Sequence, residues 1–542
     1  MEFASTKAAP PRGAIAPYRR LDIEKGVRIV LPVLVIAGLG YGFGFSLLAP
    51  SIVMPFLVPV IALGLLVIWA LPETDWAPTK TLAWLLIAFL IALPLWPNYL
   101  AIALPGMPWI TLLRIIGAPM ILLLLIALSV SAEFRRGLCA SLDATAPVWK
   151  MLVALVIIQF LSLASTVIQG GSLGESLEAF SVAQINWTAV FFLSAYVFLT
   201  PGRARFMTAA LLMTTVLLTL VAVQEWRHGV VPWVGHVPSF LKIQDPVVQR
   251  VLEGSARAAT GIHRIQATYT TSLGFAEFLA LMTPFALHLV TCARRFWVRM
   301  AAACYLPVLF WAILLTDSRL GVVGYCLSFL FYLFIHGLIK WRSERRSLVG
   351  PAIILAYPLL FTGFIVSTFF VQRLNRMVWG GGAASYSTQA RIEQYQKGLG
   401  LVMENPLGYG IGRGSVTLGF TNPEGVETID TYYLLILLEY GVLGFLIFYG
   451  LFLTGIWKAG RTLFDLGPTD REVSLLIPLI IAMSNWLIIK SIFAQADNNP
   501  LIFAMLGMMT ALIWRARNRA DQPIQSGTPR RLARPSLQPA RP

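Results

Sequence analysis

A glycine-rich turn with an arginine and a serine lies in the stretch 404-ENPLGYGIGRGS-415. Glycines at 408, 410, 412 and 414 permit positive φ angles and a close approach of the backbone to a neighbour. Successive N–H groups in such a turn can form a concave nest that binds an anion. A tight surface turn would show the same composition, so the turn alone leaves both interpretations open.

The residues before this turn predict an amphipathic helix over 388–403. Apolar side chains recur there every three or four residues, namely Ile392, Tyr395, Leu399, Val402 and Met403. The pattern places Arg391 in the first turn of the helix, with Ser387 or Thr388 as the N-cap. Asn405-Pro406 is expected to end it, because proline cannot continue a helix.

Further charged residues fall near the ends of apolar segments on what we predict to be the same membrane face. They are Arg114, Arg264, Arg319, Arg391 and Asp430. A charge inside a bilayer costs several kcal/mol, so these groups should face a cavity or a partner. They could form a cationic site, although Asp317 and Arg319 could instead pair with each other, and acids nearly balance the bases of the loops.

Composition shows which elements must position these residues. Of 542 residues, 57% are hydrophobic and 13% charged, and the mean hydropathy is +0.72. A membrane-spanning helix takes about 20 apolar residues, and about fourteen runs approach that length. They lie near 29–48, 51–71, 81–97, 108–130, 148–167, 185–200, 206–224, 269–291, 299–315, 320–338, 350–371, 430–456, 474–492 and 499–514. We therefore predict an all-α polytopic membrane protein with two long outward loops, the second partly helical.

The formal charge of +16 indicates topology, because its Lys/Arg clusters fall at one set of helix ends. The positive-inside rule makes that side and both termini cytoplasmic. The expected order is an N-terminal tail (1–27), seven spans (28–224), an outward loop (225–268), four spans (269–371), an outward loop with the glycine-rich turn (372–429), three spans (430–515) and a disordered tail (516–542). No exported disulfide is expected from the four cysteines.

Several segments, in order over residues 97–450, resemble motifs of the O-antigen ligase and O-antigen polymerase superfamily. Arg391 with its helix and the following Pro-Leu-Gly-x-Gly-x-Gly resembles one motif, and 430-DTYYLLILLEYGVLGFLIFYG-450 another. The stretch 264-RIQATYTTSLGFAEFL-279 is similar to an Arg-x-x-Gly-Thr-Phe motif that leads into a span, and 316-TDSRLG-321 to Thr-x-Ser-Arg-x-Gly. The stretch 97-PNYLAIALPGMPWITLLRI-115 resembles an early outer loop that ends in arginine.

The resemblance implies a glycosyltransferase of the bacterial inner membrane that acts at the periplasmic face without a metal or other cofactor. Its donor would be an undecaprenyl-diphosphate-linked glycan, whose diphosphate arginines can bind. The catalytic residues implied are Asp430, Arg264 and Arg391. Residues expected to bind the diphosphate or glycan are Arg114, Arg250, Arg257, Arg319, Gly408, Gly410 and Tyr433.

Asp430 stands where the family commonly has histidine. A carboxylate can also accept the proton of a hydroxyl if partial burial raises its pKa. Asp430 could instead cap the helix that follows it, and His263, His236 and Glu277 are the alternative bases.

The leading hypothesis is a polymerase that joins lipid-linked repeat units into exopolysaccharide or O-antigen. Arg250 and Gly261 resemble the Arg-x10-Gly pattern of polymerase loops. The alternatives are an O-antigen ligase or protein O-oligosaccharyltransferase with the same donor and, from another class, a transporter or lipid flippase. Expected partners are the donor, a glycan acceptor, membrane lipid, and a chain-length regulator and export machinery. No motif indicates nucleic acid, nucleotide or metal binding.

Overall fold

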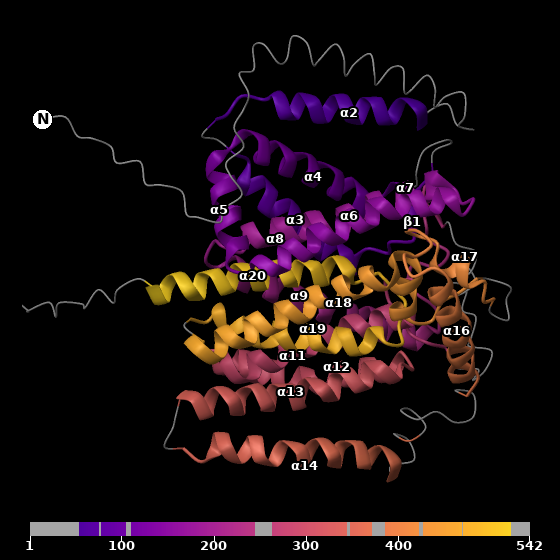
Figure 1. Cartoon of the computed structure of the whole chain (residues 1–542). Coiled ribbons are helices and arrows are strands. Elements are labelled where there is room, and N and C mark those ends of the chain that lie inside the picture. The colour runs from indigo at the N-terminus through magenta and orange to yellow at the C-terminus, as the bar shows by residue number, and fades with distance from the viewer. Residues whose placement is uncertain are drawn as a thin grey trace, which may run out of the picture.

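The computed structural model is a bundle of long apolar helices, which confirms the predicted all-α polytopic membrane fold (Figure 1). It describes residues 54–74, 77–103, 110–243, 263–343, 347–370, 375, 385–421, 427–468 and 470–521. Eleven helices in these ranges are long and apolar enough to cross a membrane. The first predicted run, 29–48, lies outside the described residues, and each of the other thirteen coincides with a helix.

The N-terminal half of the described chain is mainly helical and contains three short strands. Its helices are α2 (Met54–Ala70), α3 (Thr79–Leu95), α4 (Leu112–Val130), α5 (Ala132–Asp143), α6 (Ala146–Ile168), α7 (Leu173–Ala183), the π-helical η1 (Gln184–Ala189), α8 (Val190–Val197) and α9 (Arg203–His228). Three short strands, β1 (Leu100–Ile102), β2 (Ile110–Thr111) and β3 (Lys242–Ile243), form an antiparallel sheet in the order β2-β1-β3. In this sheet Ala101 pairs with Thr111 and Leu100 with Ile243.

The C-terminal half supplies the remaining helices, several of which pack against those of the N-terminal half, and the polar segments at one end. Its elements are α11 (Ser272–Cys292), α12 (Phe296–Leu315), α13 (Arg319–Ser343), α14 (Val349–Phe370), α16 (Ser385–Glu404), α17 (Gly414–Leu418), α18 (Tyr432–Leu466), the 3-10 turn η3 (Val473–Leu475), α19 (Leu476–Lys490) and α20 (Asn499–Asp521). Helices α9 and α20 end a few residues beyond the predicted segment limits of 224 and 515.

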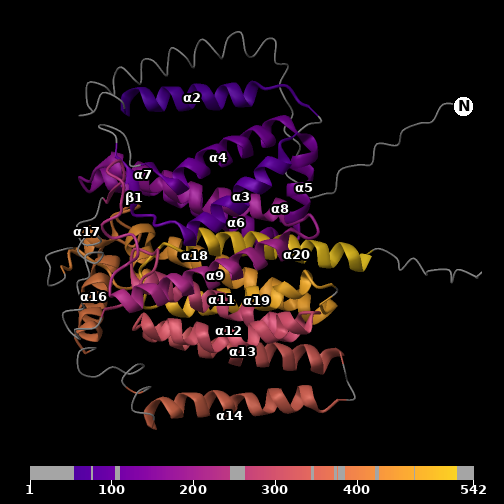
Figure 2. The same cartoon turned by 180° about the vertical axis from the view of Figure 1, so that it is seen from behind.

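The core lies around α19 and α20, which are buried almost throughout, whereas α14 is exposed over nearly its whole length. In both views α14 is the outermost helix on one side and α2 on the other (Figure 1, Figure 2). In apolar lipid the hydrophobic effect gives helices little driving force to associate, so they depend on close van der Waals packing, which small residues allow. At Gly507 of α20, an added Cβ would lie 2.4 Å from the Phe191 carbonyl oxygen of α8.

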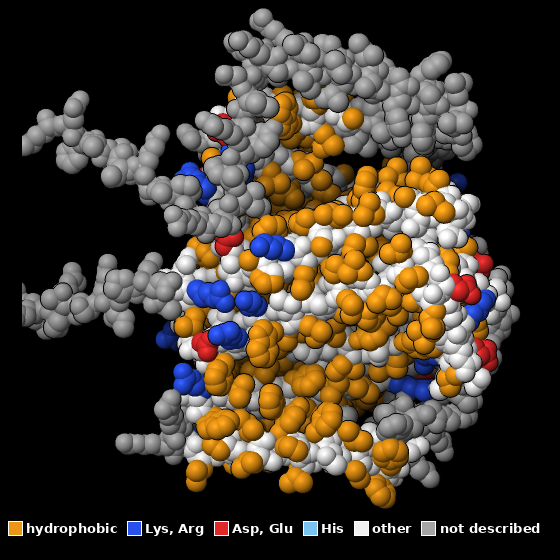
Figure 3. Space-filling model, in the orientation of Figure 1, with side chains coloured by type: hydrophobic (Ala, Val, Ile, Leu, Met, Phe, Trp, Pro, Cys, Tyr) orange, Lys and Arg blue, Asp and Glu red, His pale blue; other side chains and the backbone are white. Residues whose placement is uncertain are grey.

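The two ends of the bundle differ in character. One end, where α9, α12 and α19 begin, gathers Lys and Arg side chains, and a broad apolar surface covers the flank (Figure 3). We call it the basic end. The opposite end carries α16, α17 and β1 (Figure 1), and we call it the site end because the predicted functional residues lie there.

Candidate functional site

The predicted amphipathic helix is present as α16, and Asn405 follows its last residue as expected. The helix begins at Ser385, so Ser387 and Thr388 lie inside it and the prediction that one of them is the N-cap is wrong. Helix α16 packs against the start of α18, and Gly398 permits this contact because an added Cβ would lie 2.6 Å from Leu434 Cδ1. This packing carries Arg391 to the segment that precedes α18.

Arg391 and Asp430 meet at this contact. Arg391 Nε lies 4.0 Å from Asp430 Oδ2, and both side chains are partly exposed. Asp430 is fixed from the same helix, because its backbone N–H donates to Gln394 Oε1 at 2.8 Å. Burial raises the pKa of the Asp430 carboxyl, and the Arg391 charge partly offsets that rise.

Asp430 does not cap the helix that follows. Helix α18 begins at Tyr432 and its N-cap residue is Thr431, whose side chain makes no capping hydrogen bond. The alternative structural role of Asp430 as a helix cap is therefore wrong, and its side chain is 36% exposed.

The glycine-rich turn docks into a break in α18. The break lies at Gly441, whose φ of 68° and ψ of −173° are open almost only to glycine. Tyr409 N–H donates to the Leu438 carbonyl at 2.7 Å, and Gly410 N–H to the Glu439 carbonyl at 3.1 Å. In return, Val442 N–H donates to the Pro406 carbonyl at 3.0 Å, so turn and helix share a short ladder of hydrogen bonds.

The nest predicted for this turn is formed, and its anion is the protein's own Glu439. This carboxylate accepts hydrogen bonds from the backbone N–H groups of Gly412 and Gly414. It is 8% exposed, and an added Cβ on Gly414 would lie 3.5 Å from Glu439 Oε1. The internal partner explains why an acid lies within a span, and it argues against the turn as the diphosphate cradle.

Gly408 and Gly410 are required for packing in this turn. Both have positive φ, and added Cβ atoms would lie 2.6 Å from the Glu439 carbonyl oxygen and 2.1 Å from Thr166 Oγ1, respectively. The sequence motifs did not single out Glu439, although it is an acid inside a predicted membrane span. The available signal was the pairing of that acid with a nearby turn of four glycines.

Arg264 lies against the end of α12. Its Nε donates to the Thr316 carbonyl at 2.9 Å and its Nη2 to the Asp317 carbonyl at 3.3 Å. Asp317 has a φ of 48°, which is uncommon outside glycine, and Arg319 begins α13 two residues later. The structure thus brings two predicted site segments, 264–269 and 316–321, into contact.

Glu225 holds the Arg264 segment from the other side and was missed as a site residue. It is completely buried at the end of α9. Its Oε2 accepts from Ala267 N–H at 2.8 Å, its Oε1 from Gln266 N–H at 3.2 Å, and His263 Nε2 lies 3.0 Å from Oε1. These bonds stabilise the φ of 50° at Ala267, and they leave His263 tied to a carboxylate.

The remaining predicted residues have varied surroundings. Arg114 forms an ion pair with Glu178 at 2.6 Å, and the Tyr433 hydroxyl donates to the Leu487 carbonyl at 2.8 Å. Arg250 and Arg257 lie outside the described residues. His236 is exposed, and its Nδ1 lies 3.1 Å from the Val234 carbonyl oxygen.

Glu277, an alternative base, is completely buried in α11 and pairs with the equally buried Lys490 at 2.9 Å. A general base must reach the acceptor hydroxyl, and Asp430 is better exposed for that task. Lys490 Nζ lies 5.0 Å from the ring centroid of Tyr432, so the buried pair lies beside the first residue of α18.

Comparison with known proteins gives one family match. Residues 304–449 match the family model described as O-Antigen ligase, whereas a comparison with curated proteins gives no match. The matched range contains the Arg391–Asp430 pair, the glycine-rich turn and Glu439, which the structure joins at the site end. The match covers about a quarter of the chain and supports the similarity to the O-antigen ligase/polymerase superfamily that the sequence motifs indicate.

Proposed function

We propose that this membrane enzyme of the O-antigen ligase/polymerase type polymerises undecaprenyl-diphosphate-linked repeat units at the periplasmic face. The observation that supports the proposal best is the Arg391–Asp430 pair, a cation 4.0 Å from a carboxylate of raised pKa. An arginine suits a diphosphate leaving group and a carboxylate suits a reacting hydroxyl, so the pair offers both chemical roles.

The proposed reaction is a single displacement. A hydroxyl oxygen of the acceptor glycan attacks the anomeric carbon of the donor, and the bond from that carbon to the diphosphate oxygen breaks. The electron pair leaves with undecaprenyl diphosphate, and we assign the stabilisation of its charge to Arg391, Arg264 and Arg319. Asp430 takes the hydroxyl proton, so no covalent enzyme intermediate forms and the anomeric configuration inverts.

Glu439 and Glu225 act as positioning residues in this scheme. Glu439 ties the glycine-rich turn to α18 and thus fixes the end of α16, which carries Arg391. Glu225 ties the backbone around Arg264 to α9. Neither is assigned contact with the substrate.

An O-antigen ligase with the same donor is the second candidate, and the description of the matching family favours it. Asp430, in place of the histidine expected of ligases, favours the polymerase. A transporter or flippase receives no support from the family match, and a protein O-oligosaccharyltransferase differs from the ligase only in its acceptor.

A strain that lacks the gene tests the proposal, with wild type, Asp430→Asn or Asp430→Glu restored. The amide keeps the size of the side chain and its hydrogen bonding but cannot act as a base, so we expect polymer to fall at least about 100-fold in Asp430→Asn. The measurement is the size distribution of surface polysaccharide and of lipid-linked glycans. Immunoblots of membranes control for protein level.

The glycans that accumulate distinguish the candidates. Single lipid-linked repeats without long chains indicate a polymerase, and long lipid-linked chains that never reach an acceptor indicate a ligase. Near-normal polymer in Asp430→Asn would remove Asp430 as the base and direct the search to His263.

A further inference from the structure

A groove of about 1120 Å³ opens at the basic end between the start of α9 and the corner where α11 ends and α12 begins, at the opposite end of the bundle from Asp430. His288, Leu289 and Cys292 of α11 line it on that side. Helices α9 and α12 are joined in their middle, where Thr219 Oγ1 lies 2.8 Å from the Tyr305 hydroxyl. Toward the site end, the rings of Trp226 and Trp311 meet edge to face with centroids 5.5 Å apart. The helices therefore separate toward the basic end, and the groove fills the wedge between them.

Four arginines line this groove. Arg205 belongs to α9, Arg294 and Arg295 to the link before α12, and Arg471 to the segment before α19. All four side chains are exposed, and among the residues that the structure describes no acid pairs with their guanidinium groups. Four positive charges therefore face one cavity.

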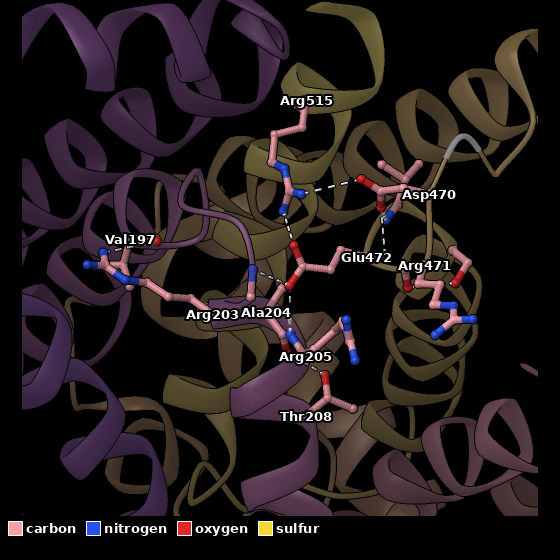
Figure 4. A network of polar contacts seen from close by, with 12 residues as sticks. Val197, Arg203, Ala204, Arg205, Thr208, Asp470, Arg471, Glu472 and Arg515 are labelled. Atoms are coloured by element: carbon pink, nitrogen blue, oxygen red, sulfur yellow. Dashed lines mark hydrogen bonds and ion pairs between the residues drawn. The ribbon is translucent and has the colours of Figure 1, made fainter. Parts of the chain in front are cut away.

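The acids beside the groove are engaged elsewhere. Glu472 accepts from the Gly202 N–H at 2.8 Å and from Arg515 at 2.5 Å, and Asp470 lies 3.4 Å from the same arginine. In Figure 4 the guanidinium groups of Arg205 and Arg471 lie apart from the dashed contacts of this network. The groove thus keeps its net positive charge although two carboxylates lie in the adjoining segment.

Apolar side chains form the rest of the wall. Phe206, Leu212 and Val298 line the groove between the helices, and Ala209 leaves space there. Phe296 and Trp297, directly after Arg295, are 65% and 81% exposed. Exposed aromatic residues of this kind lie at the bilayer interface, so the four arginines lie at the depth of the lipid headgroups and the apolar wall lies deeper.

We propose that this groove binds an anionic phospholipid. The four arginines bind the phosphate by charge-assisted hydrogen bonds, and an acyl chain lies against Phe206 and Leu212. Basic pockets between membrane helices suit such headgroups. The phosphate supplies a negative charge opposite the four arginines, and the acyl chain fills the apolar wedge. This lipid site is separate from the site at Asp430 and does not depend on the proposed reaction.

The test uses the purified full-length chain and titrates phosphatidylglycerol while native mass spectrometry counts bound lipid. We expect saturable binding in wild type and weaker binding, by about tenfold or more, in Arg205→Gln/Arg471→Gln, since both arginines attract an anionic headgroup. Ala209→Phe keeps all charges but fills the apolar wedge, and it should also weaken binding. Arg136→Gln/Arg461→Gln is the matched control, because it removes two exposed arginines at the basic end outside the groove.

Separate arms use phosphatidylcholine and inorganic phosphate as probes. Weak phosphatidylcholine binding, and no displacement of phosphatidylglycerol by inorganic phosphate, are the expected results. Displacement by inorganic phosphate would overturn the lipid assignment in favour of a free-anion site. Equal loss of binding in the control pair, or unchanged binding in both groove variants with monodisperse protein, would overturn the site.

Discussion

In the proposed reaction, the Arg391–Asp430 pair brings together two partly exposed charges with different roles. Burial raises the pKa of Asp430, which makes it a better proton acceptor near neutral pH, and Arg391 keeps the carboxylate ionised. The carboxylate is the reactive form, so activity should fall as the pH decreases through the pKa of Asp430. Glu225 and Glu439 have a different role, because their bonds to backbone N–H groups fix chain segments.

Arg391→Gln should move the acid limb of the pH profile to higher pH, since the charge that lowers the pKa of Asp430 is removed. The measurement is kcat/KM against pH with purified enzyme and lipid-linked repeats, normalised to each variant's maximum. The normalisation separates this shift from any loss of diphosphate binding. Arg114→Gln is the control, because Arg114 pairs with Glu178, and an unmoved limb in Arg391→Gln would contradict the pairing.

Among the elements, α18 decides the geometry of the site end. A continuous helix would offer its backbone groups no partner outside itself, whereas the break at Gly441 exposes the carbonyls of Leu438 and Glu439 to the glycine-rich turn. The turn and α16 are therefore attached to a membrane helix by backbone hydrogen bonds. This attachment holds Arg391 in place although its segment lies outside the bundle core.

Gly441→Ala should detach this turn and destabilise the protein by roughly 2–5 kcal/mol, from the disfavoured backbone angles and the clash together. The new Cβ would lie 2.2 Å from the Pro406 carbonyl oxygen. Thermal unfolding in detergent and proteolysis of the 405–421 segment measure the effect. Gly460→Ala in the same helix is the control, because an added Cβ there meets nothing within 4 Å. Equal effects of the two substitutions would contradict the docked turn.

In the whole molecule, a buried polar network joins the central helices at the site end. Lys490 pairs with Glu277, Asn498 Nδ2 donates to the Gly274 carbonyl at 3.0 Å, and Asn499 Nδ2 donates to the Tyr432 hydroxyl at 2.7 Å. These bonds connect α11, α18, α19 and the start of α20. Burial also raises the pKa of Asp497 in the link between α19 and α20, against the opposing effect of Lys490.

Lys490→Met should destabilise the protein by about 3–5 kcal/mol, because it leaves the Glu277 carboxylate buried without its partner. The double variant Glu277→Leu/Lys490→Met should recover much of this loss, since it removes both buried charges. Thermal unfolding in detergent measures both variants. Arg461→Met breaks the exposed pair with Asp465 and should cost less than about 1 kcal/mol. A single variant as stable as the wild type would contradict the role of the pair.

The sequence by itself determined the membrane class, the long apolar helices over the described residues and the amphipathic helix α16, but not the short helices α5, α7 and α17. Hydropathy and periodicity belong to single segments, and a span or a helix face follows from about 20 residues without knowledge of the rest. Local sequence motifs also predicted Arg391 and Asp430 as site residues. They could not give the 4.0 Å approach of these residues, because that depends on how α16 packs on α18.

Only the tertiary structure decided which partner each polar group found. The glycine-rich turn offers N–H groups to any anion, and the fold supplies Glu439. Glu277 could have served as a base, and the fold buries it against Lys490, which is 213 positions away in the sequence. In the sequence, the arginines of the basic end indicate only the orientation of the chain in the membrane. The fold places four of them around one groove. Partners of buried charges come from long-range contacts, and no local pattern of residues records those contacts.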